Sequence, residues 1–406
     1  MKPLLLSDIQ KAQSVLEKVI APTPLIRSEW LSQRYECDVF LKLETVQPVG
    51  SFKIRGASYK ISQLSAEEKK KGVVCASAGN HAQGVAWGAR EYGTHAIIVM
   101  PETASLMKVH NTQMLGAEVQ LEGENYDESF QAAQRIAKET GRTYIHAFHD
   151  ADVIAGQGTI ALEIFDQCPE VDFIVASIGG GGLIAGIGTA IRALKPSVKL
   201  VGCQAQNASS MLKSLKAHHL EQSEFKGTFA DGIAVKNADP EMFAILDQMI
   251  DLSFESDEDE IAMNVLRFME KTKLVVEGSA AIILGALDRY QKEFKGKKVV
   301  LVVCGGNIDV NLVSRIIERG LTQLGRRVHL RVQISDRPGS LSKLTSLIGS
   351  LKANILQAMH DRNDPKIKLD ETEVELLLET RGPDHSADVI TALEKSCIRV
   401  VDLNLI

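Results

Sequence analysis

The chain has 406 residues, which is enough for two or more domains with cores of their own. Hydrophobic residues make up 45% and charged residues 24% of it, as in ordinary globular proteins, and the formal net charge of -6 gives no attraction to nucleic acid or to membrane surfaces. The sequence shows no signal peptide and no apolar run long enough to span a bilayer, so we expect a cytoplasmic protein.

The first half of the chain alternates strands with helices. Short apolar runs predict buried strands, and apolar residues at helical spacing predict the helices between them. We expect strands at 39–43, 72–76, 96–101 and 116–121, and helices at 7–20, from about 53 to 64, from about 81, at 108–115 and at 127–138. This alternation is typical of an α/β fold with parallel sheet and helices on both faces.

The second half continues in the same style. Strands are predicted at 171–176, 199–203 and 298–303, with a helix from the glycines near 180 to Leu194. The acidic run from Glu255 to Glu260 has two interpretations, a catalytic cluster or the start of a helix. We favour a helix capped by Ser256, because carboxylates in the first turn complement the helix dipole.

A separate domain is predicted at the C-terminal end, with a boundary near 320–327 and Gly320 as a helix C-cap. Residues 328–334 alternate as in a half-buried strand, and 341–351 form one apolar helix face. Further strands are expected at 354–360, 373–380 and 397–403, with a helix at 385–395. The resulting β-α-β-β-α-β order is ferredoxin-like.

The first candidate for chemistry is the tight loop Gly50-Ser51-Phe52-Lys53, which places a lysine at the start of a helix. The positive end of the helix dipole disfavours a protonated amine there. A less protonated amine can attack a carbonyl, so Lys53 is a candidate Schiff-base nucleophile. Taken alone, a lysine is far more often a solvated surface charge.

Three further loops directly follow predicted parallel strands, at 77–81, 179–183 and 304–307. Open α/β sheets bind their ligands at this end of the strands. The glycines at 179–182, placed before a helix, let backbone N–H groups close on a phosphate. The loop that begins at Ser77 also opens a helix and suits a substrate carboxylate. With the reactive lysine, these loops describe a site for pyridoxal phosphate and an amino acid.

The same glycines raise the alternative of an NAD-dependent oxidoreductase. A dinucleotide fold needs an acidic residue at the end of the next strand, where this chain has Gln204, so the NAD alternative is disfavoured.

Neither disulfides nor a zinc site is expected, because the histidines show no ligand spacing and the cysteines form no C-x-x-C pair. The six cysteines are Cys37, Cys75, Cys168, Cys203, Cys304 and Cys397.

The motifs at 50–57 (GSFKIRGA), 77–84 (SAGNHAQG), 156–159 (GQGT), 179–183 (GGGGL) and 304–307 (CGGN) resemble the threonine ammonia-lyases, or threonine dehydratases. These are fold-type II pyridoxal-phosphate enzymes with a fold similar to tryptophan synthase β. The resemblance implies a catalytic domain at 1–322 with two open parallel-sheet subdomains, the smaller at about 46–145. The tail at 326–406 looks like a single ACT domain, a module that binds amino-acid effectors in relatives.

This resemblance also implies roles for individual residues. Lys53 would carry pyridoxal phosphate covalently and later take the α-proton, and Asn80 would hydrogen-bond the ring hydroxyl. The phosphate would lie on Gly179, Gly180, Gly181, Gly182 and Leu183.

Four more residues complete the implied pocket. Ser77 and neighbouring N–H groups would hold the substrate carboxylate, and Cys304 would lie beside the pyridine nitrogen. Phe52 and Glu277 would line the site. A thiol at 304 cannot keep the ring nitrogen protonated as a carboxylate would, so we expect elimination rather than transamination.

Two departures from similar enzymes refine the expected activity. Serine racemases place a serine where this chain has Ala78, and a methyl group cannot transfer a proton, so we expect little racemisation. Gly227 stands where some relatives have an acidic metal ligand, so no divalent metal is expected, while a monovalent cation on backbone carbonyls stays open.

The expected reaction converts L-threonine to 2-oxobutanoate and ammonia, with L-serine giving pyruvate in the same way. We expect a homo-oligomer, dimer or tetramer, that isoleucine inhibits through the tail as part of isoleucine biosynthesis. The alternatives are a serine ammonia-lyase or racemase of the same fold, a non-catalytic amino-acid sensor, and a tail that only aids assembly.

Overall fold

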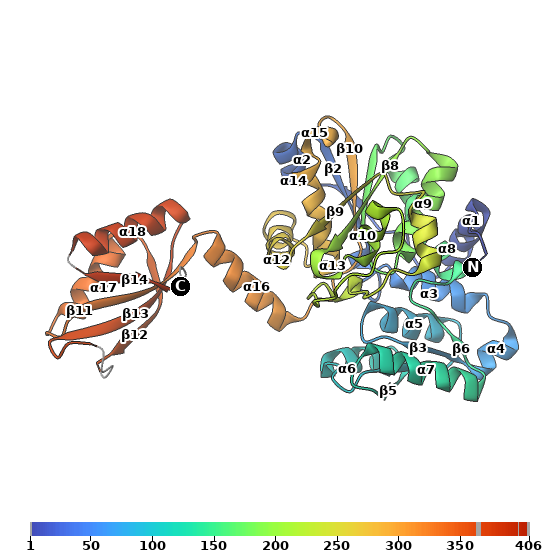
Figure 1. Cartoon of the computed structure of the whole chain (residues 1–406), viewed down its shortest axis with the longest axis horizontal. Helices are drawn as coiled ribbons and strands as arrows, with labels where there is room; N and C mark the ends of the chain where they lie inside the picture. The colour runs from blue at the N-terminus through green and yellow to red at the C-terminus, as the bar shows by residue number, and fades with distance from the viewer. Residues whose placement is uncertain (1, 363–366, 397, 404–406) are drawn as a thin grey trace. The chain divides into compact units, whose positions relative to one another are not determined.

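The computed structural model describes residues 2–362, 367–396 and 398–403. Within them the chain forms two compact units, residues 1–308 and 309–406 (Figure 1). No helix in these described ranges is both long and apolar enough to cross a membrane. The five described cysteines are unpaired, and Cys397 lies outside the described residues.

A six-stranded sheet forms the centre of the first unit, in the order β1-β2-β10-β7-β8-β9. All its neighbours pair in parallel except the edge strand β1, which is antiparallel to β2. Helices flank this sheet on both sides, as Figure 1 shows. The strands are β1 (Leu25–Arg27), β2 (Asp38–Leu43), β7 (Phe173–Ser177), β8 (Lys199–Ala205), β9 (Leu252–Ser256) and β10 (Lys298–Val303).

A smaller parallel sheet lies in the same unit, in the order β5-β4-β3-β6. Alternate residues of β3 face opposite sides, so Val73 and Cys75 pack towards α5, while Val74 and Ala76 pack towards α7. The strands are β3 (Val73–Ala76), β4 (Ala96–Met100), β5 (Glu118–Leu121) and β6 (Thr143–Tyr144). The two parallel sheets confirm the predicted pair of open α/β layers.

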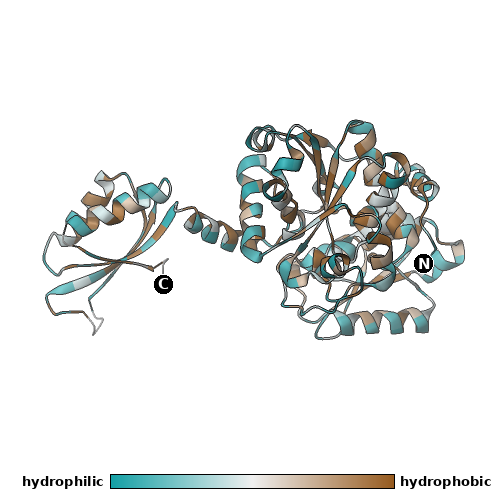
Figure 2. Ribbon diagram, turned by 45° about the horizontal axis from the view of Figure 1, so that its top comes forward, coloured by the Kyte–Doolittle hydropathy of each residue, from teal (hydrophilic) through white to brown (hydrophobic). Residues whose placement is uncertain are grey.

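Helices cover these sheets, and Figure 2 shows their hydrophilic outer faces against the hydrophobic strands. In the first part they are α1 (Leu6–Leu16), α2 (Glu29–Tyr35), η1 (Glu44–Val46), α3 (Lys53–Ser62), α4 (Ala66–Lys71), α5 (Asn80–Glu91), α6 (Leu106–Met114), α7 (Tyr126–Thr140) and α8 (Ala151–Gln167). They continue with α9 (Gly182–Leu194), η2 (Gln206–Ala208), α10 (Ser210–Ala217), η3 (Asp231–Ile233), α11 (Pro240–Leu246), α12 (Glu258–Arg267), the π-helical turn η4 (Phe268–Thr272), α13 (Gly278–Ala281), η5 (Ile282–Leu284), α14 (Gly285–Arg289) and α15 (Gln291–Phe294).

Helices α3, α8 and α9 approach one another at two pairs of glycines. A Cβ on Gly156 would lie 2.6 Å from the Cα of Gly56, and a Cβ on Gly186 would lie 2.6 Å from the backbone N of Gly158. Real Cβ atoms do not come so close, so any side chain at these positions would push the helices apart. This glycine seam holds the helix of Lys53 directly against the large-sheet helices.

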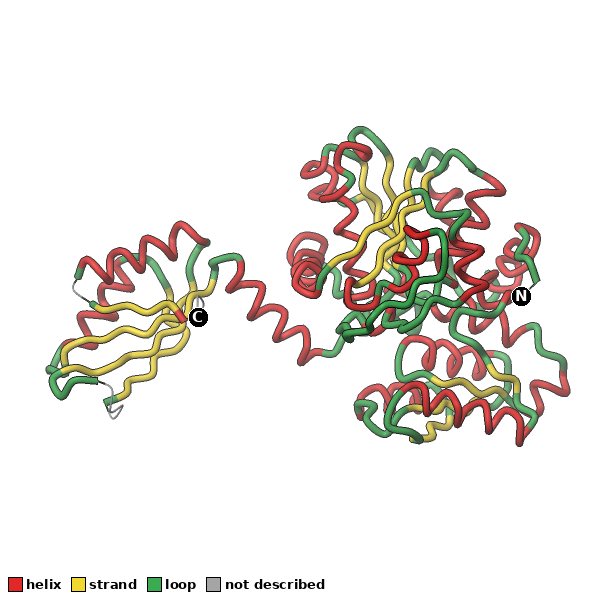
Figure 3. Tube along the Cα trace, in the orientation of Figure 1, coloured by secondary structure: helices red, strands yellow, loops and turns green. Residues whose placement is uncertain are grey.

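The second unit begins with α16 (Val310–Gln323) and continues with a four-stranded antiparallel sheet in the order β12-β13-β11-β14 (Figure 3). Its elements are β11 (Arg327–Ser335), α17 (Ser340–Ser350), β12 (Asn354–Asp361), β13 (Glu371–Glu379), α18 (Pro383–Lys395) and β14 (Arg399–Asp402). The predicted β-α-β-β-α-β order is therefore observed. Val328, Leu330 and Val332 are buried against the two helices, as the period of two requires.

Two local predictions were wrong. Asp257, not Ser256, caps α12, because its side chain accepts a hydrogen bond from the N–H of Glu260 while Ser256 ends β9. Gly320 does not end a helix, since α16 continues to Gln323 and the glycine with a positive φ is Gly325. In both places the capping residue, Asp257 and Leu324, lies further along the chain than predicted, by one and by four positions.

Candidate active site

The Lys53 loop lies against the end of β10. The N–H of Phe52 donates to the carbonyl of Cys304 at 3.0 Å, and the N–H of Gly306 donates to the carbonyl of Gly50 at 2.9 Å. Asn307 adds a third contact, because its Nδ2 donates to the carbonyl of Val49 at 2.8 Å. Two of the four predicted loops are thus joined by backbone hydrogen bonds.

Lys53 is the first residue of α3, as predicted. Its Nζ donates to the carbonyl of Ala147 at 2.9 Å and lies 5.2 Å from the centroid of the Phe52 ring. Burial lowers the pKa of Lys53 to about 8, against the opposing pull of Cys304 and Glu277. A substantial fraction of this amine is neutral near pH 8, which is the form that attacks a carbonyl.

Asn80 and Glu277 form a pair between the two sheets of the first unit. The Nδ2 of Asn80, at the start of α5, donates to both carboxylate oxygens of Glu277 at 2.8 and 2.9 Å. Its Oδ1 accepts from Asn307 at 2.7 Å. Burial, together with the negative charge of Asp231, raises the pKa of Glu277, while Ser279 and Asn80 oppose that rise by hydrogen bonding.

Cys304 is buried directly after β10 and lies between two serines. Its Sγ is 3.6 Å from the Oγ of Ser177 and 3.6 Å from the carbonyl oxygen of Ser279. Burial raises the pKa of the Cys304 thiol to about 12, so it stays neutral at ordinary pH. A neutral hydroxyl-and-thiol environment has no charge with which to hold a proton on a neighbouring ring nitrogen.

The glycine loop connects β7 to α9. Among the described residues, the N–H groups of Gly180, Gly181 and Gly182 donate to no protein acceptor. Gly181 has a φ of +96°, which only glycine adopts freely, and a Cβ on Gly180 would lie 2.2 Å from the ring of Phe148. Leu183 follows, buried in the first turn of α9. The loop therefore offers unpaired donors at the positive end of a 13-residue helix.

The Ser77 loop connects β3 to α5. The Oγ of Ser77 accepts from the N–H of Gly79 at 3.2 Å, which holds the turn in shape. No atom lies within 4 Å of where a Cβ on Gly79 would be, so the loop borders open space. This is a second helix N-terminus with room for an anion beside it.

Sequence reasoning missed the segment that connects these loops, residues 145–149. His146 fixes it, because its Nδ1 accepts the N–H groups of Phe148 and His149 at 3.2 and 2.8 Å. Ala147 then meets Lys53, and Phe148 meets the glycine loop. The segment follows β6, which has two residues and is too short to show a period. The only available signal was the run of aromatic and histidine residues.

The residues present fit a phosphate-bearing aldehyde. The amine of Lys53, with its lowered pKa, suits an imine to the aldehyde. The unpaired N–H groups at the start of α9 suit the phosphate, and the neutral thiol of Cys304 suits an unprotonated ring nitrogen. The described part of the chain has no group of three His, Cys, Asp or Glu side chains placed to hold a metal ion.

Comparison with known proteins agrees with a pyridoxal-phosphate site. The family model described as "Pyridoxal-phosphate dependent enzyme" matches residues 16–305. L-threonine ammonia-lyase of Thermotoga maritima is 44% identical over 384 residues, covering 95% of this chain and 96% of that protein. The processed threonine deaminase isoform 2 of Solanum lycopersicum superimposes with a TM-score of 0.74 at 35% identity, covering 77% of this chain and 91% of that one. Maize serine racemase has the same TM-score, 0.74, at 30% identity, covering 79% and 98%.

Proposed function

The chain belongs to the pyridoxal-phosphate dependent enzymes of fold-type II, and we infer from this that it is an L-threonine ammonia-lyase, which converts L-threonine to 2-oxobutanoate and ammonia. The observation that carries the inference is an identity of 44% maintained over 95% of the chain. L-Serine, which has the same leaving group on the same carbon, is the expected second substrate and gives pyruvate.

Pyridoxal phosphate, when bound, withdraws electrons from the α-carbon of the amino acid and so makes the α-proton acidic. We propose that Lys53 holds it covalently and that the N–H groups of Gly179–Gly182 and Leu183 bind its phosphate. Asn80, fixed between Glu277 and Asn307, orients the ring, and Phe52 lies beside the amine.

Once the substrate's amino group has replaced it on the cofactor, the freed amine of Lys53 takes the α-proton at Nζ. Its pKa of about 8 places the amine where it can both accept and return a proton at ordinary pH. The Ser77 loop and the first N–H groups of α5 bind the substrate carboxylate, which leaves the α-carbon facing Nζ. The β-hydroxyl then leaves with a proton as water, and hydrolysis of the unsaturated product by water gives the 2-oxo acid and ammonia.

Cys304 favours this outcome over transamination. Its thiol has a pKa of about 12 and stays neutral, so it does not help to place positive charge on the ring. Elimination needs less of that charge, because the hydroxyl departs from the neighbouring carbon. Conversion of alanine to pyruvate by transamination, at a rate that rivals threonine turnover, would contradict this role.

The direct test is an assay of purified, cofactor-loaded protein with L-threonine and L-serine. We expect 2-oxobutanoate and pyruvate, together with ammonia in equal amount. Borohydride reduction should attach the cofactor to Lys53, and a peptide map identifies the residue. Absence of both oxo acids, or a label on another lysine, would contradict the proposal.

A serine racemase is the second candidate, and the 30% identity to the maize enzyme over 79% of this chain is what favours it. Racemisation needs an acid on the opposite face of the α-carbon, and Ala78 has no proton to give. We therefore expect little D-serine. Chiral analysis of the serine left after partial turnover distinguishes the two activities.

We also propose that residues 326–406 are an ACT regulatory module, within a homo-oligomeric, cytoplasmic enzyme. The ferredoxin-like order of the second unit supports this. The segment 336–341, which runs from a turn into the start of α17, also supports it, because it resembles the effector loop of such modules. Isoleucine is the proposed inhibitor, in keeping with a place in isoleucine biosynthesis. The unpaired cysteines are consistent with a reducing compartment.

A further inference from the structure

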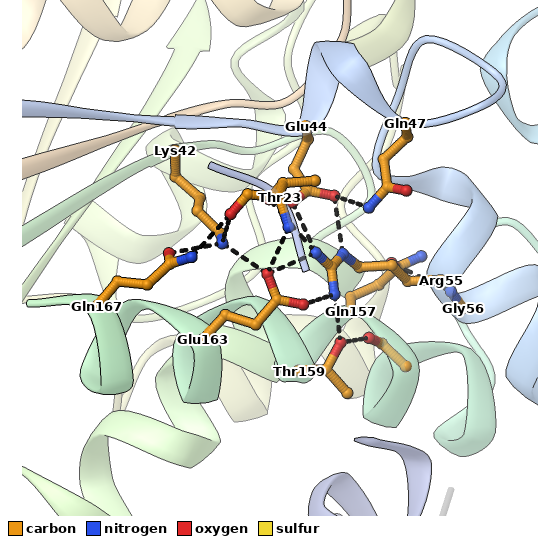
Figure 4. Close-up of polar contacts among 11 residues, drawn as sticks. Thr23, Lys42, Glu44, Gln47, Arg55, Gly56, Gln157, Thr159, Glu163 and Gln167 are labelled. Atoms are coloured by element: carbon orange, nitrogen blue, oxygen red, sulfur yellow. Dashed lines mark hydrogen bonds and ion pairs between the residues drawn. The ribbon is translucent and has the colours of Figure 1, made fainter. Parts of the chain in front are cut away.

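Four charged side chains form a buried cluster behind the Lys53 loop: Lys42, Glu44, Arg55 and Glu163 (Figure 4). Their side chains are 0, 0, 2 and 10% exposed. Two positive and two negative groups give the cluster no net charge. We refer to these four residues as the buried charge cluster.

Two members of the cluster bracket the Lys53 loop in the sequence. Glu44 begins η1 just before the loop, and Arg55 lies two residues after Lys53 in the first turn of α3. Arg55 binds Glu44 through two atoms, Nε to Oε2 at 2.8 Å and Nη2 to Oε1 at 2.9 Å. This bidentate ion pair closes the base of the loop that carries the reactive amine.

Both ends of this ion pair are anchored further. Arg55 reaches α8, donating to Glu163 Oε1 at 2.5 Å and to the Oγ1 of Thr159 at 3.1 Å. On the other side, Gln47 donates to Glu44 at 3.2 Å, and its carbonyl accepts the N–H of Gly50 at 2.7 Å. A continuous set of polar contacts thus runs from α8, through the ion pair, into the loop.

The outer side of the loop is held by the contacts to Cys304, Gly306 and Asn307 described above. The segment 49–52 is therefore fixed from two directions, and Lys53 follows it immediately. Burial lowers the pKa of Lys42. Burial also favours the neutral carboxyl of Glu44, but the positive charge of Arg55 outweighs this effect and lowers the pKa of Glu44. Arg55 therefore holds Glu44 in its charged form inside the protein.

We propose that Glu44 and Arg55 are positioning residues for the reaction, in that their ion pair aims Lys53 at the ends of the parallel strands. This inference rests on the proposed function. A displacement of reacting groups by about 1 Å can cost on the order of 100-fold in rate, so a loosened loop should be visible in kcat. A variant that only lowers the stability of the fold, and leaves the loop in place, should keep its kcat.

The cluster supplies its own matched control. Lys42 is as buried as Glu44 but contacts Thr23, Glu163 and Gln167, none of which belongs to the loop. Lys42→Met removes one buried charge without touching the loop, whereas Glu44→Gln removes one and opens the base of the loop. Both variants should lose thermal stability.

The experiment compares Glu44→Gln, Arg55→Lys and Lys42→Met with the wild-type holoenzyme. For Glu44→Gln and Arg55→Lys we expect kcat for threonine to fall about tenfold or more, with KM within roughly twofold, since the carboxylate site is untouched. The visible circular dichroism of the bound cofactor should also change. Lys42→Met should keep both the spectrum and, within roughly twofold, kcat, although its melting temperature falls.

A double variant, Glu44→Gln with Arg55→Gln, separates charge balance from positioning. It leaves Lys42 and Glu163 as a neutral pair, so stability should recover relative to Glu44→Gln alone, while kcat stays low. Recovery of kcat together with stability would overturn the proposal, and so would equal kcat losses in Glu44→Gln and Lys42→Met.

If the buried substitutions fail to fold, Gln47→Leu gives a milder test of the same contacts, and an unchanged kcat and spectrum would then count against the inference. Measurements on the wild-type protein distinguish a failure of this inference from a failure of the proposed function. A wild type that makes 2-oxobutanoate and is labelled at Lys53 upholds the function whatever the variants do.

Discussion

At the scale of single residues, Lys53 shows how a fold alters an ordinary side chain. Two effects favour its neutral form, the positive end of α3 and burial, and only the second is strong enough to lower the pKa to about 8. The dipole could be read from the sequence, but the burial could not. It depends on Phe52 and on the segment at Ala147, which meet only in three dimensions.

Replacing this amine should abolish the reaction without unfolding the protein. Lys53→Ala removes both the attachment point and the base, and loss of a general base alone costs about 100- to 10,000-fold in rate. We expect no measurable 2-oxobutanoate and no borohydride-stable label, with a far-UV circular dichroism spectrum like that of the wild type. Lys60→Ala, on the same helix, is the control. Residual turnover within tenfold of wild type would exclude Lys53 as the base.

Ala78 provides a gain-of-function test. Ala78→Ser places a hydroxyl in the loop that opens α5, on the position that serine racemases fill. D-Serine should then appear during L-serine turnover at a rate clearly above that of the wild type, because the opposite face gains a proton donor. Chiral chromatography measures it, with Ala82→Ser, on the buried side of α5, as the control. An unchanged D-serine rate would contradict the assignment.

A buried histidine, His81, and a half-buried one, His146, predict acid sensitivity. Burial lowers the pKa of His81 to about 3 and that of His146 to about 4, whereas unfolded histidine titrates near 6.5. The unfolded chain therefore binds more protons below pH 6.5, and the free energy of unfolding should fall as the pH drops from 6.5 to 5. Urea denaturation at each pH measures the slope. His81→Gln, whose amide reaches the position of Nε2 and so keeps a donor for the Ile145 carbonyl, should flatten it, and an unchanged slope would show that other groups are responsible.

At the scale of elements, the sequence predicts regular strands and misses what lies between them. β3, β4, β8 and β10 were all placed within two residues, because buried parallel strands are continuous apolar runs bounded by turns. β1, β6 and β9 were missed, since two are only two or three residues long and β9 has polar residues at Ser253, Glu255 and Ser256.

The candidate site divides in the same way. Loops that follow strands could be placed together from the sequence, because parallel strands end at one edge of a sheet. The side chains that hold those loops in place, such as Asn307 and His146, could not be identified. The partners of Asn307 are 227 and 258 positions away in the sequence, and His146 follows a strand of only two residues. The buried charge cluster could not be predicted for the same reason. In the sequence, each of its members looks like an ordinary surface charge.

Two exposed ion pairs connect the small-sheet helices to the large-sheet side of the first unit. Lys108 of α6 meets Asp231 of η3 at 2.7 Å, and Lys236 meets Asp127 of α7 at 2.6 Å. Their exposure limits each to about 0–1 kcal/mol of stability. We expect them to help hold the two sheets together when substrate is bound.

The double variant Lys108→Met with Lys236→Met should therefore raise KM for threonine roughly two- to threefold at low salt, with little change in kcat or in the free energy of unfolding. At about 0.5 M NaCl the wild type should approach the variant, because salt screens exposed pairs. Lys295→Met, which breaks an exposed pair with Glu36 inside the large-sheet half, is the control. A salt-independent difference in KM would contradict this explanation.

At the scale of the whole molecule, the chain combines an α/β unit that carries the candidate site with an antiparallel unit that carries none of its residues. The second unit has a complete core of its own, from Val328 to Leu393. A unit with its own core can be removed without opening the core of the other unit.

Removal of residues 326–406 should leave threonine turnover within a few-fold of the full chain and abolish inhibition by isoleucine. The reason is that the proposed effector loop lies in the removed part, whereas Lys53 and its partners do not. Dose–response curves for isoleucine on both proteins measure the effect. If the shortened protein is insoluble, Asp336→Ala in the full chain replaces it. Inhibition that persists unchanged would place the effector site elsewhere.

The glycine seam between α3, α8 and α9 has a consequence for how such genes can be recombined. Gly56, Gly156, Gly158 and Gly186 come from three separate stretches of the chain, and a Cβ on any of the four would lie within 3.0 Å of an atom of another stretch. Chimeras that take these stretches from different parents should express well only when both parents keep the matching glycines. In a shuffled library, the three stretches should therefore be inherited as a block among the folded survivors.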